Sequence, residues 1–176
     1  MGTQQTREGK QPKQKTPTFL LELPLQVEAG QAKRLCAHLE VGRQFYNAVL
    51  SEGQKRLRQM RADPAWQAAR AIPRSQKQER RAAFSALRKQ YGFSEAGLQA
   101  YAKEARVSFL ADHLDAVLAQ TLATRAYQAL NRVCVGKAKR VRFKSRGRRL
   151  DSIENKRNDT GFIEHQAAFN LANTVL

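Results

Sequence analysis

Apolar side chains recur every three or four residues through most of the middle of this chain, the spacing of one face of an α-helix. They predict a long helix from about Gly30 to Arg61. Its apolar stripe consists of Leu35, Leu39, Phe45 with Tyr46, Val49 and Leu57. Gly42 and Gly53 fall on the same stripe, where small residues would let a second helix approach closely.

Capping and turn residues divide the rest of the helical region. Asp63 followed by Pro64 predicts an N-cap and a short helix to about residue 71. Trp66 would anchor this helix to the core; the alternative is that it stacks on a base. A further helix is expected over residues 75–91, ended by Gly92. Ser94 then begins the longest helical pattern, which runs to about residue 135. Its apolar stripe shifts near residues 109–112, which predicts a bend or two separate helices.

Two stretches that flank the helices alternate with a period of two, as strands do. In residues 18–27 the alternating positions are leucines and a phenylalanine, and Pro24 would place this strand at an edge or at its end. In residues 140–144 a strand would turn Val141 and Phe143 inward and Arg140, Arg142 and Lys144 outward.

These patterns together predict a mainly α protein, in which a helical bundle is inserted into a small and incomplete β element. The expected divisions are a disordered basic N-terminus over 1–17, a split β element over 18–28 and 136–162, a helical domain over 29–135, and an atypical tail over 163–176.

The charge balance favours a polyanionic partner. The chain has 32 Lys and Arg against 15 Asp and Glu, for a net charge of +17. Such a field attracts nucleic acid first, an anionic membrane second and an acidic protein third. The stretch Gly136–Arg149 holds eight Lys and Arg and no acidic residue, so it is predicted to contact nucleic-acid phosphates. Its basic residues are Lys137, Lys139, Arg140, Arg142, Lys144, Arg146, Arg148 and Arg149; the alternative is a solvated basic tail.

No arrangement of residues in the sequence has the form of a catalytic or metal site. Asp112 and Asp115 are one helical turn apart, but a capping or solvated role is favoured because no third carboxylate joins them. His38, His113 and His165 are isolated and lack metal-ligand spacing. We therefore predict no catalytic residue, no metal ligand, no cofactor and no small-molecule substrate for this chain.

Three features that the sequence lacks predict the cellular compartment of the protein. Cys36 and Cys134 make no disulfide framework and are interpreted as buried thiols. The first fifteen residues lack an apolar signal core, and no apolar run approaches the ~20 residues that span a bilayer. A cytoplasmic, nucleoid-associated protein without membrane contact is expected.

Several segments, in order, resemble the N-terminal half of the TnpB-type transposon-encoded proteins, which are RNA-guided nucleases related to type V CRISPR effectors. The resemblance extends over residues 19–161. It rests on Phe19-Leu20-Leu21-Glu22-Leu23-Pro24-Leu25, Arg43-Gln44-Phe45-Tyr46-Asn47, Tyr91-Gly92-Phe93-Ser94, Lys103-Glu104-Ala105-Arg106, Leu122–Leu130, and Gly136–Arg149 with Leu150–Lys156 after it.

The resemblance implies a wedge-like β domain interrupted by a helical recognition lobe, which holds guide RNA and helps to position target DNA. It adds Arg43, Tyr46 and Asn47 to the expected nucleic-acid contacts, although local physics alone favours core packing by Phe45 and Tyr46 with Arg43 in solvent. Mg²⁺ is expected only for the family's later nuclease domain. Residues 158–176 contain no Lys or Arg, so a chain truncated or frameshifted before that domain is expected; the alternative is a genuine short C-terminal helix. The alternative function is a stand-alone basic helical scaffold or regulator that binds an acidic protein.

Overall fold

The computed structural model describes residues 26–107, 109–147 and 150, and its regular elements there are all helical. In chain order they are α1 (Ala29–Ala62), α2 (Pro64–Ala71), α3 (Lys77–Gln90), α4 (Glu95–Ala105), the short 3₁₀ helix η1 (Phe109–Asp112) and α5 (Ala116–Cys134). The prediction of a mainly α protein is confirmed, and so are the long first helix and the division of the pattern near residues 109–112.

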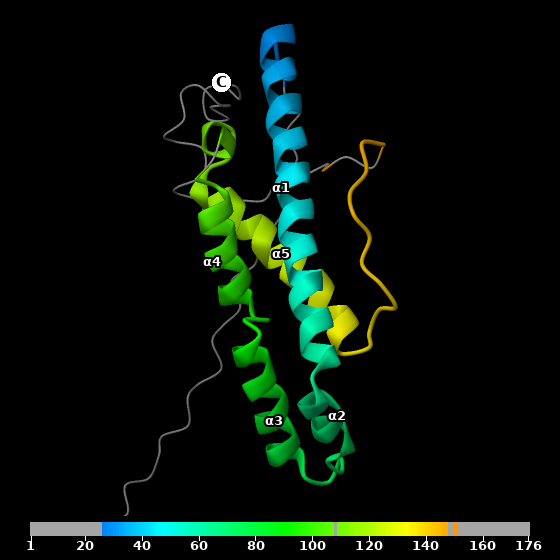
Figure 1. Cartoon of the computed structure of the whole chain (residues 1–176). Coiled ribbons are helices and arrows are strands. Elements are labelled where there is room, and N and C mark those ends of the chain that lie inside the picture. The colour runs from blue at the N-terminus through cyan, green and yellow to red at the C-terminus, as the bar shows by residue number, and fades with distance from the viewer. Residues whose placement is uncertain (1–25, 108, 148–149, 151–176) are drawn as a thin grey trace, which may run out of the picture.

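The long helix α1 is the axis of the structure. Its 34 residues span about 51 Å at ~1.5 Å per residue. Figure 1 shows α5 crossing α1, with α4 beside them and with α2 and α3 gathered near the C-terminal end of α1. The core lies where α1, α4 and α5 meet. Its most deeply buried side chains are Phe45, Val49, Leu50 and Met60 of α1, Leu98 of α4, Leu122 and Leu130 of α5, and Phe93 and Leu114 from the connections.

Gly53 allows the helices to come this close. A Cβ placed on Gly53 would overlap Cδ1 of Leu130 in α5 and lie 3.1 Å from Cδ1 of Leu98 in α4. Both leucines are fully buried, so neither has free space to move into. The prediction that a small residue on the α1 stripe permits close helix packing is therefore confirmed at Gly53.

Short polar side chains begin three of the helices. The side chains of Asp63, Ser94 and Asp115 accept hydrogen bonds from backbone N–H groups in the first turns of α2, α4 and α5. The capping role expected of Asp115 is confirmed. Asp63 also accepts a 2.7 Å hydrogen bond from the hydroxyl of Tyr91, which lowers the pKa of the Asp63 carboxyl and ties the start of α2 to the end of α3.

Glycines in the left-handed conformation end α3 and α5. Gly92 has φ 58° and Gly136 has φ 79°, values that residues with a Cβ adopt only with strain. After α3, the N–H of Phe93 reaches the carbonyl of Arg88 at 2.8 Å, and after α5 the N–H of Lys137 reaches that of Arg132 at 2.8 Å. Each hydrogen bond closes a Schellman motif, which reverses the chain direction and satisfies a helix-end carbonyl.

The predicted strand over residues 140–144 is wrong. These residues have no strand or helix assignment. Their neighbour is the helix α1, and a helix cannot act as a partner strand. The backbone of α1 uses its own N–H and C=O groups in hydrogen bonds within the helix, so it offers no ladder to pair with. Of the other predicted strand, over residues 18–27, residues 18–25 lie outside the described residues, and residues 26–27 have no strand assignment. The expected tails over 1–17 and 163–176 also lie outside the described residues.

Three smaller expectations have different outcomes. Trp66 is 8% exposed and packs edge-to-face on Phe84 with ring centroids 4.9 Å apart, so its anchoring role is confirmed. Cys36 is exposed and Cys134 is half-buried, so neither is a fully buried thiol. His38 and His113 are not isolated: their rings lie 5.4 Å apart, and His38 Nδ1 donates to the carbonyl of His113 at 2.9 Å.

Candidate nucleic-acid interface

Residues 137–147, here called the basic segment, form the strongest candidate for a functional surface. The segment begins at the glycine turn that ends α5. The guanidinium of Arg61, in the last turn of α1, donates to the carbonyl of Val133 at 2.8 Å, so the start of the segment is fixed to the C-terminal end of α1. Figure 1 shows the segment leaving this point and running back alongside α1.

The length of the segment agrees with a nearly extended path along α1. Its far end is held at Asn47, fourteen positions before Arg61 on the helix, or about 21 Å at ~1.5 Å per residue. The seven steps from Lys137 to Lys144 span at most about 25 Å when fully extended. An extended chain antiparallel to α1 therefore fits, and a helical one would be too short.

Asn47 holds the far end by its side-chain amide. Its Nδ2 donates to the carbonyl of Lys144 at 2.8 Å, and its Oδ1 accepts from the N–H of Lys144 at 2.9 Å. One amide thus satisfies both backbone groups of a single residue, as a neighbouring strand would have done. This contact joins residues 97 positions apart in the sequence.

Arg43 adds a third hydrogen bond to the same residue. Its Nη1 donates to the carbonyl of Lys144 at 2.6 Å, while its Nε and Nη2 donate to the carboxylate of Glu40 at 2.8 and 2.6 Å. These last two hydrogen bonds are the main reason that the pKa of Glu40 is about 2, and the charge of Arg146 lowers it further. The Arg43 side chain is only 12% exposed, so the expectation that it lies in solvent is wrong.

The exposure of the basic segment follows a period of three. Ala138, Val141 and Lys144 are half-buried, and the residues between them are exposed. This is the period of an extended polyproline-type chain, whereas a strand would have a period of two. Val141 packs on the core, as expected, but Phe143 is 48% exposed. The prediction that Phe143 points inward is therefore wrong.

Most cations of the segment face solvent without a carboxylate. Within the described residues, the ion pairs are Arg43 with Glu40 and Arg56 with Glu52, both inside α1. The exposed basic residues of the segment are Lys137, Lys139, Arg140, Arg142 and Arg146. Arg146 shares a small hollow with Glu40, so its charge is partly offset. Arg148 and Arg149 lie outside the described residues.

The helix motif of residues 43–47 therefore positions the segment. Arg43 and Asn47 use their polar groups within the chain, and Phe45 is buried in the core. Tyr46 packs on the same core, and its burial raises the pKa of its hydroxyl, against the opposing charge of Arg125. Whether Arg43, Tyr46 and Asn47 also touch nucleic acid stays a prediction. The alternation of polar and aromatic residues in this motif could not reveal that its partner is Lys144, about 100 residues away.

Arg58 is a functional candidate that sequence reasoning does not single out from the other cations of the first helix. By helical spacing it lies on the same face of α1 as Asn47 and Arg61, the two residues between which the segment runs. Its side chain is exposed. Helical periodicity places Arg58 on that face, but only the structure shows that the basic segment runs along the same face.

The described residues offer neither a metal site nor a membrane-spanning helix. They contain no group of three or more His, Cys, Asp or Glu that could hold a metal ion. Among them, no helix is long and apolar enough to cross a bilayer. No protein-family model, curated protein or solved structure matches the chain.

Proposed function

We propose that this protein binds nucleic acid through the phosphate backbone, with the basic segment on α1 as the main contact surface. The observation that carries the proposal is that Lys137, Lys139, Arg140 and Arg142 are exposed, with no carboxylate partner among the described residues, on a segment that Asn47 and Arg43 fasten to a helix. A fixed row of cations loses less conformational entropy on binding than a free tail.

The spacing of the segment suits a polyanion. Neighbouring residues of an extended chain lie about 3.3 Å apart, and duplex DNA carries one phosphate charge per ~1.7 Å of axis. Contacts of this kind give affinity that depends strongly on salt and carries little base specificity. The exposed Phe143 between cations adds a ring on which an unpaired base can stack.

The test compares two variants with the same loss of charge. In the segment variant, Lys139, Arg140, Arg142 and Arg146 become Gln. In the control, four exposed cations on other surfaces, Lys33, Arg34, Lys89 and Lys103, become Gln. Fluorescence anisotropy with a structured RNA and a DNA duplex, between 50 and 300 mM salt, gives the slope of log K against log salt.

The segment variant should reduce the magnitude of that slope by about 3.6 on duplex if all four cations contact phosphates, since each lost contact contributes ~0.9. The control should reduce it by less than 1. Equal effects of the two variants would show that binding follows net charge alone, and no binding by the wild type at 50 mM salt would refute the function.

We also infer that the chain corresponds to the guide-RNA- and DNA-binding portion of a TnpB-type protein. The order of the motifs supports this inference. The resemblance also implies a wedge-like β element over 18–28 and 136–162. It remains part of this proposal only for those residues of the two ranges that the structure does not describe. The protein with Mg²⁺ should leave DNA uncut; metal-dependent cleavage would contradict a purely binding role. Association with an acidic protein that survives RNase and DNase would instead favour the scaffold alternative.

A further inference from the structure

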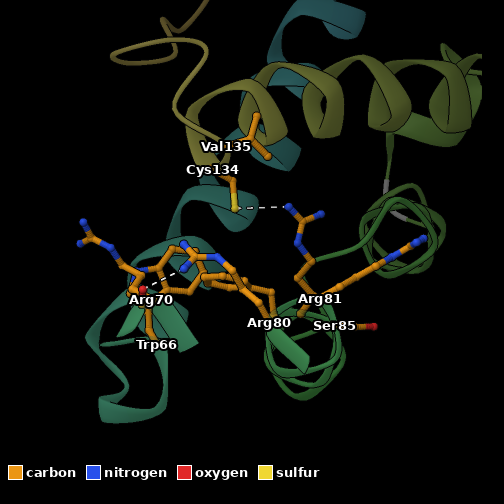
Figure 2. A pocket seen from close by; sticks show the side chains of 9 residues that line it. Trp66, Arg70, Arg80, Arg81, Ser85, Cys134 and Val135 are labelled. Carbon is orange, nitrogen blue, oxygen red and sulfur yellow. Dashed lines mark hydrogen bonds between the residues drawn. The ribbon is translucent and has the colours of Figure 1, made fainter. Parts of the chain in front are cut away.

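A hollow of about 570 Å³ lies between α2, α3 and the C-terminal end of α5, and four arginines line it. They are Arg70 of α2 and Arg80, Arg81 and Arg88 of α3. The remaining described residues that line it are Trp66, Phe84, Ser85, Cys134 and Val135, so none of the described lining residues is a carboxylate. We call it the arginine groove. Figure 2 shows Arg80 reaching from α3 toward α2, while Arg70 and Arg81 extend outward at opposite edges.

The two inner arginines are held by neutral acceptors. Arg80 Nη1 donates to the carbonyls of Arg70 and Ile72 at 2.9 and 2.6 Å. Arg88 donates to the Tyr127 hydroxyl at 3.2 Å, to Asn131 Oδ1 at 2.9 Å and to Cys134 Sγ at 3.5 Å. These contacts fix the guanidinium groups, and no carboxylate of the described part of the chain neutralises either positive charge.

Arg80 also keeps donors for a ligand. Its Nη1 is used by two backbone carbonyls, whereas its Nε and Nη2 have no acceptor within the part of the chain that the structure describes. A guanidinium carries five N–H donors, so three remain. The group lies 5.4 Å from the centre of the Phe84 ring, which keeps it in place. A half-buried, fixed guanidinium with free donors suits a phosphate oxygen.

The groove offers an apolar surface beside these charges. Phe84 is half-buried, Trp66 lines the groove next to it, and Val135 at the rim is 51% exposed. A ligand that fits both surfaces carries a phosphate and a flat, weakly polar ring, which describes an unpaired nucleotide. Moreover, Val135 immediately precedes Gly136 and the basic segment, so the groove and the segment adjoin at the end of α5.

We propose that the arginine groove binds an unpaired nucleotide of the nucleic acid whose phosphate backbone lies on the basic segment. The inference rests on the proposed function and deepens it, because it assigns single-stranded nucleic acid to a specific part of the surface. Arg70 and Arg81 bracket the phosphates at the rim, Arg80 binds one inside, and the base lies against Phe84 and Val135.

The single tryptophan of the chain, Trp66, makes the groove directly observable. An unstructured RNA 12-mer should quench or shift its fluorescence, whereas a blunt DNA duplex should bind with a much smaller change. In a double variant, Arg70→Gln with Arg81→Gln, the two exposed rim cations are lost and the fold should be retained. Its affinity for the 12-mer should fall about tenfold and its affinity for the duplex less than twofold.

The matched control is the double variant Arg34→Gln with Lys103→Gln, which loses the same charge from exposed positions elsewhere on the surface. A further variant, Arg80→Lys, keeps the charge but loses the planar fork, and it should also weaken binding of the 12-mer. If the groove variants match the control on the 12-mer, or if the 12-mer binds without changing Trp66 fluorescence, the groove proposal is overturned. The segment variant still tests the proposed function separately, because it should weaken both ligands.

Discussion

Replacing Asn47 with Ala removes the clamp that holds the basic segment on α1. Two hydrogen bonds to the backbone of Lys144 are lost, at 2.8 and 2.9 Å. The carbonyl of Lys144 keeps Arg43 as a donor, but its N–H has no other acceptor among the described residues. At about 1 kcal/mol for each hydrogen bond, docking of the segment should weaken by about 2 kcal/mol, or roughly 30-fold in population.

The global stability should change less. Alanine is a better helix former than asparagine by roughly 0.6 kcal/mol, so the free energy of unfolding should fall by at most about 1.5 kcal/mol. Hydrogen exchange by NMR separates the two effects, because the amide of Lys144 reports the docked segment and the amides of α5 report the whole fold.

Ser51→Ala is the matched control, because Ser51 is an exposed residue of α1 whose replacement gives a similar gain in helix propensity. We expect faster exchange at Lys144 in Asn47→Ala and no change there in Ser51→Ala. Unchanged protection of Lys144 in Asn47→Ala would refute the assignment of Asn47 as the clamp. Loss of protection throughout α5 would show that Asn47 supports the core instead.

Three further predictions concern the frame that carries the segment. Gly53→Ala should destabilise the fold by about 1–3 kcal/mol in denaturant unfolding despite the gain in helix propensity, because the new methyl group overlaps Leu130; an unchanged or higher stability would contradict tight packing there. Gly136→Ala should cost about 1 kcal/mol, since φ is 79°, and should weaken RNA binding by altering the start of the segment. Glu40 has a pKa of about 2, below its usual 4.5. The stabilising effect of its carboxylate is therefore complete above pH 4.5 and is lost as the pH falls through 2. The difference in free energy of unfolding between wild type and Glu40→Gln should vanish as the pH falls from 4.5 to 2.

The helical frame is predictable because its signals are local. Capping residues such as Asp63, Ser94 and Asp115, the helix-ending Gly92 and Gly136, and the apolar period all act within a few residues of one another. The exposure of the cations in the segment is also predictable from sequence, since a stretch of fourteen residues with eight Lys and Arg and no acidic residue cannot be buried without a large desolvation cost.

The errors arise where the partner of a residue is distant in the sequence. Alternation in residues 140–144 suggests a strand. No local pattern could show that these residues would lie beside the helix α1, which holds them through the side chains of Arg43 and Asn47. For the same reason the local pattern places Arg43 in solvent, although it contacts Lys144. The arginine groove is not visible in the sequence because its residues come from three helices and share no common spacing.

By itself, then, the sequence determined where helices begin and end, which faces they bury and that the protein carries a strong positive field. Only the tertiary structure decided that the basic residues lie on α1 as an extended segment fixed by Asn47 and Arg43, with Phe143 outward. The physical reason is that helix formation depends on contacts three or four residues apart, whereas the place of an irregular segment depends on which distant side chains can satisfy its backbone.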